Sequence, residues 1–180
     1  MQSRKQFLLN SLSITSGIAL LGGKSFPKPP INTSDASYLS FDLHCHPGRL
    51  FALDNSGDGK YADATKTLNE MKAAHLGGAF FTLVADSKIL QLGPTGVSVT
   101  GGFKTGEAWV DYKKQLKITK DFFHASSVRQ STKASDLNKS GSVAAYLAVE
   151  GGDFLEGKVE KLDEAFIGGI RKFHKNPSYK

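Results

Sequence analysis

The sequence predicts an α/β protein built around a parallel sheet. Apolar segments rich in strand-forming residues alternate with segments of helical periodicity, the order expected when helices connect parallel strands. Two of the strand segments, residues 79–85 and 142–149, are almost continuously apolar, which is typical of strands buried on both faces. The 19 glycines of the chain also favour many tight turns between short elements.

Composition and charge limit the possible classes of function. Hydrophobic residues make up 39% and charged residues 22% of the 180 residues, as in an ordinary soluble globular protein. The formal net charge is +6, but part of the excess lies before residue 27, and no basic stripe interleaved with aromatic residues follows. We therefore expect no nucleic-acid partner. The single cysteine, Cys45, excludes an internal disulfide.

The N-terminal part resembles an export region followed by a linker. Ser3 to Leu8 is similar to a twin-arginine signal in which lysine replaces the second arginine. The stretch from Leu8 to Leu21 is only weakly apolar, so we expect no transmembrane span. We interpret residues 1–26 as a twin-arginine-like export signal and residues 27–37 as a linker, and we expect an exported, periplasmic protein.

The folded part, residues 38–180, begins with a strand that ends in two histidines. Within residues 40–48, alternation along a strand places Asp42, His44 and His46 on one face. Two imidazoles and a carboxylate at the C-terminal end of a strand suit a metal ion such as zinc. The alternative is a strand edge with incidental histidines.

A loop, a helix and a buried strand follow. We expect the loop over residues 49–60 and a helix capped by Asp63, which runs to about Leu76 before the Gly77–Gly78 pair ends it. Asp86 follows the strand of residues 79–85, and a turn former is a better interpretation of it than a site residue.

The second half of the chain repeats the alternation of helix and strand. Glu150 directly follows the apolar strand of residues 142–149. Gly151 and Gly152 come next, and glycine allows the backbone to approach a ligand closely. The other expected elements are a loop or small hairpin over residues 91–104, a helix over 107–129, a helix with apolar residues Val159, Leu162 and Phe166, and a strand from Ile170 to Phe173.

The polar residues at strand ends define a candidate site. In (β/α)₈ barrels the functional residues gather at the C-terminal ends of the strands, and Asp42, His44, His46 and Glu150 all fit that rule. Of these residues, we predict His44, His46 and Glu150 as metal ligands.

Two motifs resemble the membrane (renal-type) dipeptidases of the amidohydrolase superfamily. They are residues 42–47 (Asp-Leu-His-Cys-His-Pro) and residues 149–157, where Glu-Gly-Gly after an apolar strand is the more specific. The resemblance implies a TIM (β/α)₈-type metal-dependent hydrolase barrel with two zinc ions, which hydrolyses dipeptides or similar small amides. His44 matches the family's first histidine ligand, whereas His46 stands where the family commonly has aspartate. Glu150 matches the carboxylate that bridges the metals, so the resemblance also implies that Glu150 is the catalytic residue.

The resemblance also implies that about half of the barrel is present. The family takes two more histidine ligands and a late aspartate from later strands, and its substrate-binding histidine aligns nearer Pro177 than His174. A complete barrel takes about 250 residues. We therefore expect an incomplete chain, weakly active or inactive, that forms a homodimer or pairs with a missing C-terminal half.

Two other classes of function remain open. Residues 42–46 also resemble the opening motif of PHP-type metal-dependent phosphoesterases, although that family does not predict the Glu-Gly-Gly motif at Glu150. The other alternative is a non-enzymatic exported half-barrel that folds only with a partner.

Overall fold

The computed structural model describes residues 40–53, 59–94, 96–137 and 142–174. The predicted export signal and linker, residues 1–37, lie outside the described residues. No helix in the described part of the chain is both long enough and apolar enough to cross a membrane.

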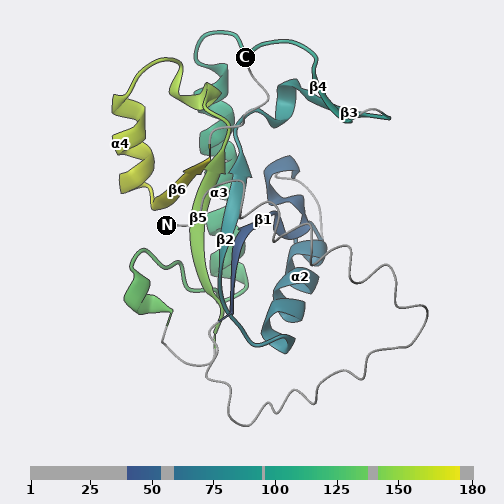
Figure 1. Cartoon of the computed structure of the whole chain (residues 1–180), viewed down its shortest axis with the longest axis vertical. Helices are drawn as coiled ribbons and strands as arrows, with labels where there is room; N and C mark the ends of the chain where they lie inside the picture. Colours follow the sequence, from purple (N-terminus) through teal and green to yellow (C-terminus); the bar gives the residue numbers. More distant parts are fainter. Residues whose placement is uncertain (1–39, 54–58, 95, 138–141, 175–180) are drawn as a thin grey trace, which may run out of the picture. The chain divides into compact units, whose positions relative to one another are not determined.

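Four parallel strands form the central sheet, in the order β1-β2-β5-β6 (Figure 1). The strands are β1 (Ser40–Cys45), β2 (Leu76–Val84), β5 (Ala144–Glu150) and β6 (Ile170–His174). The predicted α/β class with a parallel sheet is therefore confirmed. The described strands form an open sheet with β1 and β6 at its edges, which is compatible with part of a larger α/β fold.

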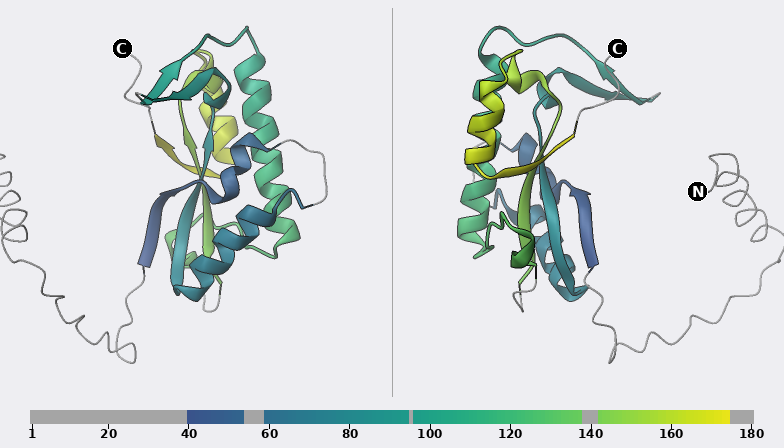
Figure 2. Two further views of the ribbon diagram at one scale, coloured as in Figure 1. Left: turned by 90° about the vertical axis from the view of Figure 1, so that its right-hand side faces the viewer. Right: turned by 60° about the vertical axis from the view of Figure 1, so that its left-hand side comes forward.

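Three helices connect these strands and lie on one face of the sheet (Figure 2). They are α2 (Ala62–Ala73), α3 (Glu107–Ala125) and α4 (Glu160–Ile167). The segment predicted as a loop or hairpin forms the antiparallel hairpin of β3 (Leu90–Gly93) and β4 (Gly96–Val99). Short 3₁₀ turns complete the described chain: η1 (Pro47–Ala52), η2 (Ser87–Ile89), η3 (Ala134–Asp136) and η4 (Asp153–Leu155).

The core lies between the sheet and its helices. Alternate side chains of β2 and β5 point toward the helices, and Phe81, Leu83 and Leu147 among them are almost completely buried. They meet the apolar stripe of α3, whose Phe123 ring packs edge-on against Phe81 with ring centroids 5.1 Å apart. Burial of apolar area is the main stabilising term, so this layer holds the strands that carry the candidate ligands.

The boundaries of three predicted elements were wrong. The expected loop begins with the 3₁₀ turn η1, and α3 ends at Ala125 rather than at residue 129. Helix α2 ends at Ala73, and the glycines expected to stop it, Gly77 and Gly78, belong to β2. A Cβ atom at Gly78 would lie 2.8 Å from the ring of Phe41, so this glycine lets the ring cross the strand.

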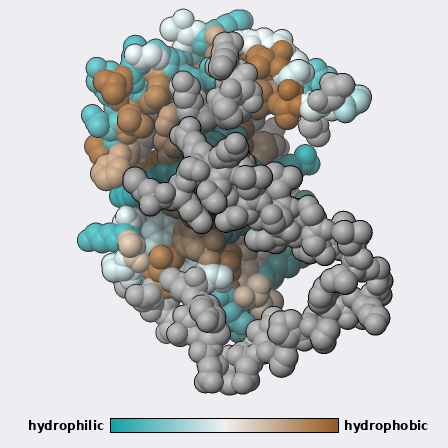
Figure 3. Space-filling view, in the orientation of Figure 1, coloured by the Kyte–Doolittle hydropathy of each residue, from teal (hydrophilic) through white to brown (hydrophobic). Residues whose placement is uncertain are grey.

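The apolar residues of α4 lie on the surface and not in the core. Val159, Phe166 and Ile167 are at least 60% exposed, whereas the small Ala165 is buried. Figure 3 shows the resulting hydrophobic surface over α4. The helix is present as predicted, but no described element covers its outer side.

The sheet curves until its two edge strands approach each other. In a flat sheet, three strand intervals would separate β1 from β6 by about 14 Å. Instead, the Lys172 ammonium on β6 donates a hydrogen bond to the carbonyl oxygen of Leu43 on β1, at 2.7 Å. The rings of His44 and His174 also lie close, with centroids 5.8 Å apart. The sheet face opposite the helices, called the open face below, is therefore concave at the C-terminal ends of the strands.

Gly48 allows η1 to lie directly against the start of α2. It adopts a φ of +52°, and a Cβ atom there would overlap the backbone nitrogen of Ala64 and lie 2.7 Å from its Cα atom. Since backbone atoms cannot rotate away, only glycine fits at this crossing. The contact holds the chain that follows His46 against the helical layer.

We expect Gly48→Ala to destabilise the fold by on the order of 3 kcal/mol, because it combines left-handed strain with a backbone overlap. Gly59→Ala is the matched control, since Gly59 has a φ of +78° but no atom within 4 Å of its Cβ position. The control should cost only about 1 kcal/mol. Urea unfolding measures both variants, and equal losses of stability would contradict the assigned contact.

Candidate metal centre

A bulge in β1 aims His44 into the open face. The register of β1 with β2 is irregular between Asp42 and Cys45, so the backbone there needs other partners. The Asp42 carboxylate accepts a hydrogen bond from the His44 amide at 2.9 Å, and Lys172 donates to the carbonyl oxygen of Leu43. Asp42, predicted to share a face with the histidines, therefore lies outside the cluster and stabilises the bulge.

His46 follows the end of β1 and is oriented by a backbone carbonyl of β2. Its Nδ1 atom lies 3.0 Å from the carbonyl oxygen of Thr82. A carbonyl oxygen only accepts hydrogen bonds, so Nδ1 carries the proton and Nε2 of the neutral ring carries a lone pair. This is the tautomer that presents Nε2 to a metal ion.

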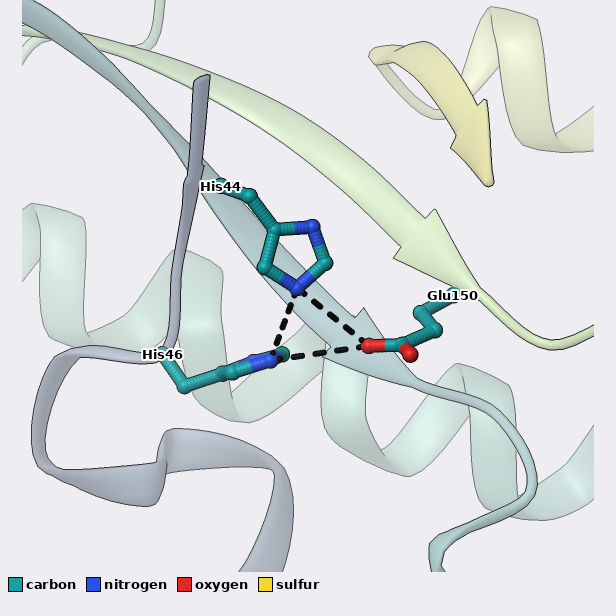
Figure 4. Close-up of side chains that lie close together, drawn as sticks. All are labelled: His44, His46 and Glu150. Atoms are coloured by element: carbon teal, nitrogen blue, oxygen red, sulfur yellow. Dashed lines mark hydrogen bonds and ion pairs between the residues drawn. The ribbon is translucent and has the colours of Figure 1, made fainter. Parts of the chain in front are cut away.

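Glu150 closes the group from the C-terminal end of β5. Its backbone carbonyl accepts a hydrogen bond from the Ala85 amide at 2.8 Å, which fixes the strand end beside β2. Its Oε2 atom lies 3.3 Å from Nε2 of His44 and 3.6 Å from Nε2 of His46 (Figure 4). The three residues predicted as ligands are therefore brought together.

The three side chains direct their electron-rich atoms at one another. The two Nε2 atoms of His44 and His46 are 3.0 Å apart, and with a Glu150 oxygen they all lie within 4.8 Å. Within the described ranges, this is the only group of three or more such residues. Two imidazole nitrogens and one carboxylate oxygen form a donor set that zinc uses in catalytic sites, where a fourth position is left for water.

The surroundings of His44 favour its neutral imidazole form. Burial, and next the neighbouring His46, lower the pKa of His44 below its usual 6.5, while the Glu150 carboxylate opposes this shift. Lys172 and His174 act in the same direction as His46. Metal ions bind the unprotonated ring, so this environment keeps His44 in the form that a metal requires.

Cys45 lies between the two histidines but is not a candidate ligand. Its thiol donates a hydrogen bond to the carbonyl oxygen of Phe80 at 3.1 Å. Burial raises the pKa of the thiol to about 12, whereas the metal-binding form of cysteine is the thiolate. The donor set is therefore nitrogen and oxygen only.

Three further residues near the cluster were missed or underestimated. Lys172 was not predicted as a site residue. Asp86 lies in a turn, as expected, but it is also completely buried behind Gly151 at the start of η2. Gln115 is buried in α3, and its signal is a polar residue within an apolar helical stripe. His174 is the strand neighbour of Glu150, although its ring is not part of the group of three.

Comparisons with known proteins do not assign the chain to a family. No protein-family model matches the sequence, and no curated protein matches it significantly. The dipeptidase resemblance therefore depends on the two sequence motifs.

Gly151→Ala should disturb the metal centre, because a Cβ atom at this φ of +86° would lie 2.8 Å from Cγ of the buried Asp86 carboxyl group. The strand end would have to move and Glu150 with it. We expect zinc affinity to fall about 10-fold or more, as for other residues that orient ligands.

Gly157→Ala is the control for this variant, because Gly157 has a φ of +71° and open space at its Cβ position. It should keep wild-type zinc affinity in a titration against a chelating dye. If both variants lost affinity equally, the contact between Asp86 and Gly151 would not be the cause.

Proposed function

We propose that this chain is a zinc-dependent hydrolase of the dipeptidase type, with His44, His46 and Glu150 as the ligands of one zinc ion. The observation that carries the proposal is the convergence of the His-x-His and Glu-Gly-Gly motifs at the C-terminal ends of β1 and β5. These motifs lie about a hundred residues apart in the sequence, so their meeting is a property of the fold.

The donor set supports a metal ion more than a hydrogen-bonded surface group. Nε2 of His44, Nε2 of His46 and an oxygen of Glu150 face the same space. At most one proton can lie between any two of these three atoms. A divalent cation satisfies all three donors at once. The side chains keep 35%, 29% and 22% of their area exposed for His44, His46 and Glu150, so water and substrate can reach them.

When bound, zinc lowers the pKa of its water to about 7 and polarises a carbonyl group. The chain's own residues prepare the site for that chemistry. The Thr82 carbonyl holds the tautomer of His46, and the bulge at Asp42 directs His44 toward the same point. Glu150 contributes the negative charge, and the family resemblance implies that its carboxylate would also hold a second ion.

Dipeptides or similar small amides are the proposed substrates because both motifs resemble those of the dipeptidases. Glu-Gly-Gly after an apolar strand is the more specific of the two motifs. The described residues offer one group of three ligands, so we propose one tightly held ion and slow turnover. The twin-arginine-like segment at residues 1–26 supports export to the periplasm as part of the same proposal.

Removing any one ligand should abolish tight zinc binding. His44→Gln, His46→Gln and Glu150→Gln should each lower the affinity by more than about 100-fold, beyond the effect typical of residues that only orient ligands. His124→Gln is the control, because His124 is exposed on α3. Isothermal titration should give one zinc ion per wild-type chain and per control chain, and unchanged affinity in all three ligand variants would refute the site.

The substrate class is tested by comparing amides with phosphate esters. We expect slow, zinc-dependent hydrolysis of dipeptides that chelator removes and that Glu150→Gln abolishes, with no hydrolysis of p-nitrophenyl phosphate. Phosphate-ester turnover without dipeptide turnover would favour the phosphoesterase class. Zinc binding without either activity would contradict a hydrolase and leave a metal-binding, non-enzymatic role.

A further inference from the structure

Strand β2 extends beyond its neighbour β1. The last paired residue of β1, Cys45, faces Phe81, whereas β2 continues to Val84. Alternate residues of a strand direct their backbone groups to opposite neighbours, and Ala85 bonds to Glu150 on the β5 side. The backbone groups of Val84 therefore point to the side where β1 has already ended.

The side chain of Gln115 takes the place of the absent strand. Its Oε1 atom accepts a hydrogen bond from the Val84 amide at 3.0 Å, and its Nε2 donates to the Val84 carbonyl oxygen at 2.8 Å. A side-chain amide thus makes the pair of bonds that a strand backbone would make. Gln115 is only 1% exposed and Val84 is also buried, so water does not supply these bonds.

Asp111 holds the amide of Gln115 in this orientation, and Lys88 in turn binds Asp111. Nε2 of Gln115 also donates to Oδ2 of the buried Asp111, one helical turn earlier, at 2.7 Å. The other oxygen of Asp111 accepts from the Lys88 ammonium at 2.9 Å. The bonds form a continuous chain from half-exposed Lys88 to the end of β2.

This chain of bonds reaches the candidate ligands through the backbone. Val84 is the strand neighbour of Glu150, and the next residue, Ala85, donates to the Glu150 carbonyl oxygen. Two residues before Val84, the Thr82 carbonyl orients the ring of His46. The segment that Gln115 holds therefore contacts two of the three ligands.

We propose that Gln115 is a positioning residue of the metal centre: its amide fixes the end of β2, which in turn sets where Glu150 and His46 meet. This inference rests on the proposed zinc site. It predicts that loss of the amide changes the geometry of the bound metal and not only the stability of the fold.

The test compares Gln115→Met with Gln91→Met in the full chain, using zinc and cobalt(II) as probes. Methionine nearly preserves the volume of glutamine but makes neither bond to Val84, and Gln91 is an exposed residue of β3. We expect Gln115→Met to lower zinc affinity about 10-fold or more and to change the cobalt(II) d–d absorption bands. Gln91→Met should match the wild type in both measurements.

Each possible outcome supports or overturns the role of Gln115 as a positioning residue. If Gln115→Met lowers the urea midpoint but keeps wild-type zinc affinity and cobalt spectrum, Gln115 is only structural and the inference is wrong. If the wild type binds no zinc, the proposed function fails with it. If Gln115→Met does not fold, Lys88→Met decides: a loss of zinc affinity of about 3-fold supports the chain of bonds, and unchanged affinity overturns it.

Discussion

Strand β2 continues past the last paired residue of β1, so the backbone groups at its end need hydrogen-bond partners from elsewhere. His46 and Gln115 supply them, at Thr82 and Val84. The candidate metal centre depends on this constraint, because His46 is a candidate ligand and Glu150 is the strand neighbour of Val84. The hydrogen bond that completes the edge of the sheet also determines which nitrogen of His46 faces the cluster.

The features that depend on local pattern were predictable from the sequence. An apolar run such as residues 142–149 indicates a buried strand without any knowledge of which strands pair with it. The positions of His44 and Glu150 near the ends of β1 and β5 follow from where those two apolar patterns stop. Features that depend on register between distant segments were not predictable. Asp42 bonds to the His44 amide only because β1 bulges, and Gly78 lies within β2 where the Phe41 ring leaves no space for a Cβ atom.

The convergence of three electron-rich atoms distinguishes this centre from scattered surface histidines. Their mutual approach is unfavourable unless a proton or a cation lies between them, and the lowered pKa of His44 argues against additional protons. A bound zinc ion would remove that conflict, and it would supply an activated water molecule and polarise a carbonyl group. The proposed amide chemistry joins this geometry to the Glu-Gly-Gly motif at Glu150, in which Gly151 allows the buried Asp86 carboxyl group to pack against the strand end.

The most direct test of this account is X-ray absorption spectroscopy of the zinc-loaded protein. The account predicts a first shell of nitrogen and oxygen only, at about 2.0–2.2 Å, with outer-shell scattering from two imidazoles. His44→Gln should reduce that imidazole scattering to one ring. A sulfur scatterer at about 2.3 Å, which would require Cys45, or a shell without imidazole would contradict the assigned centre.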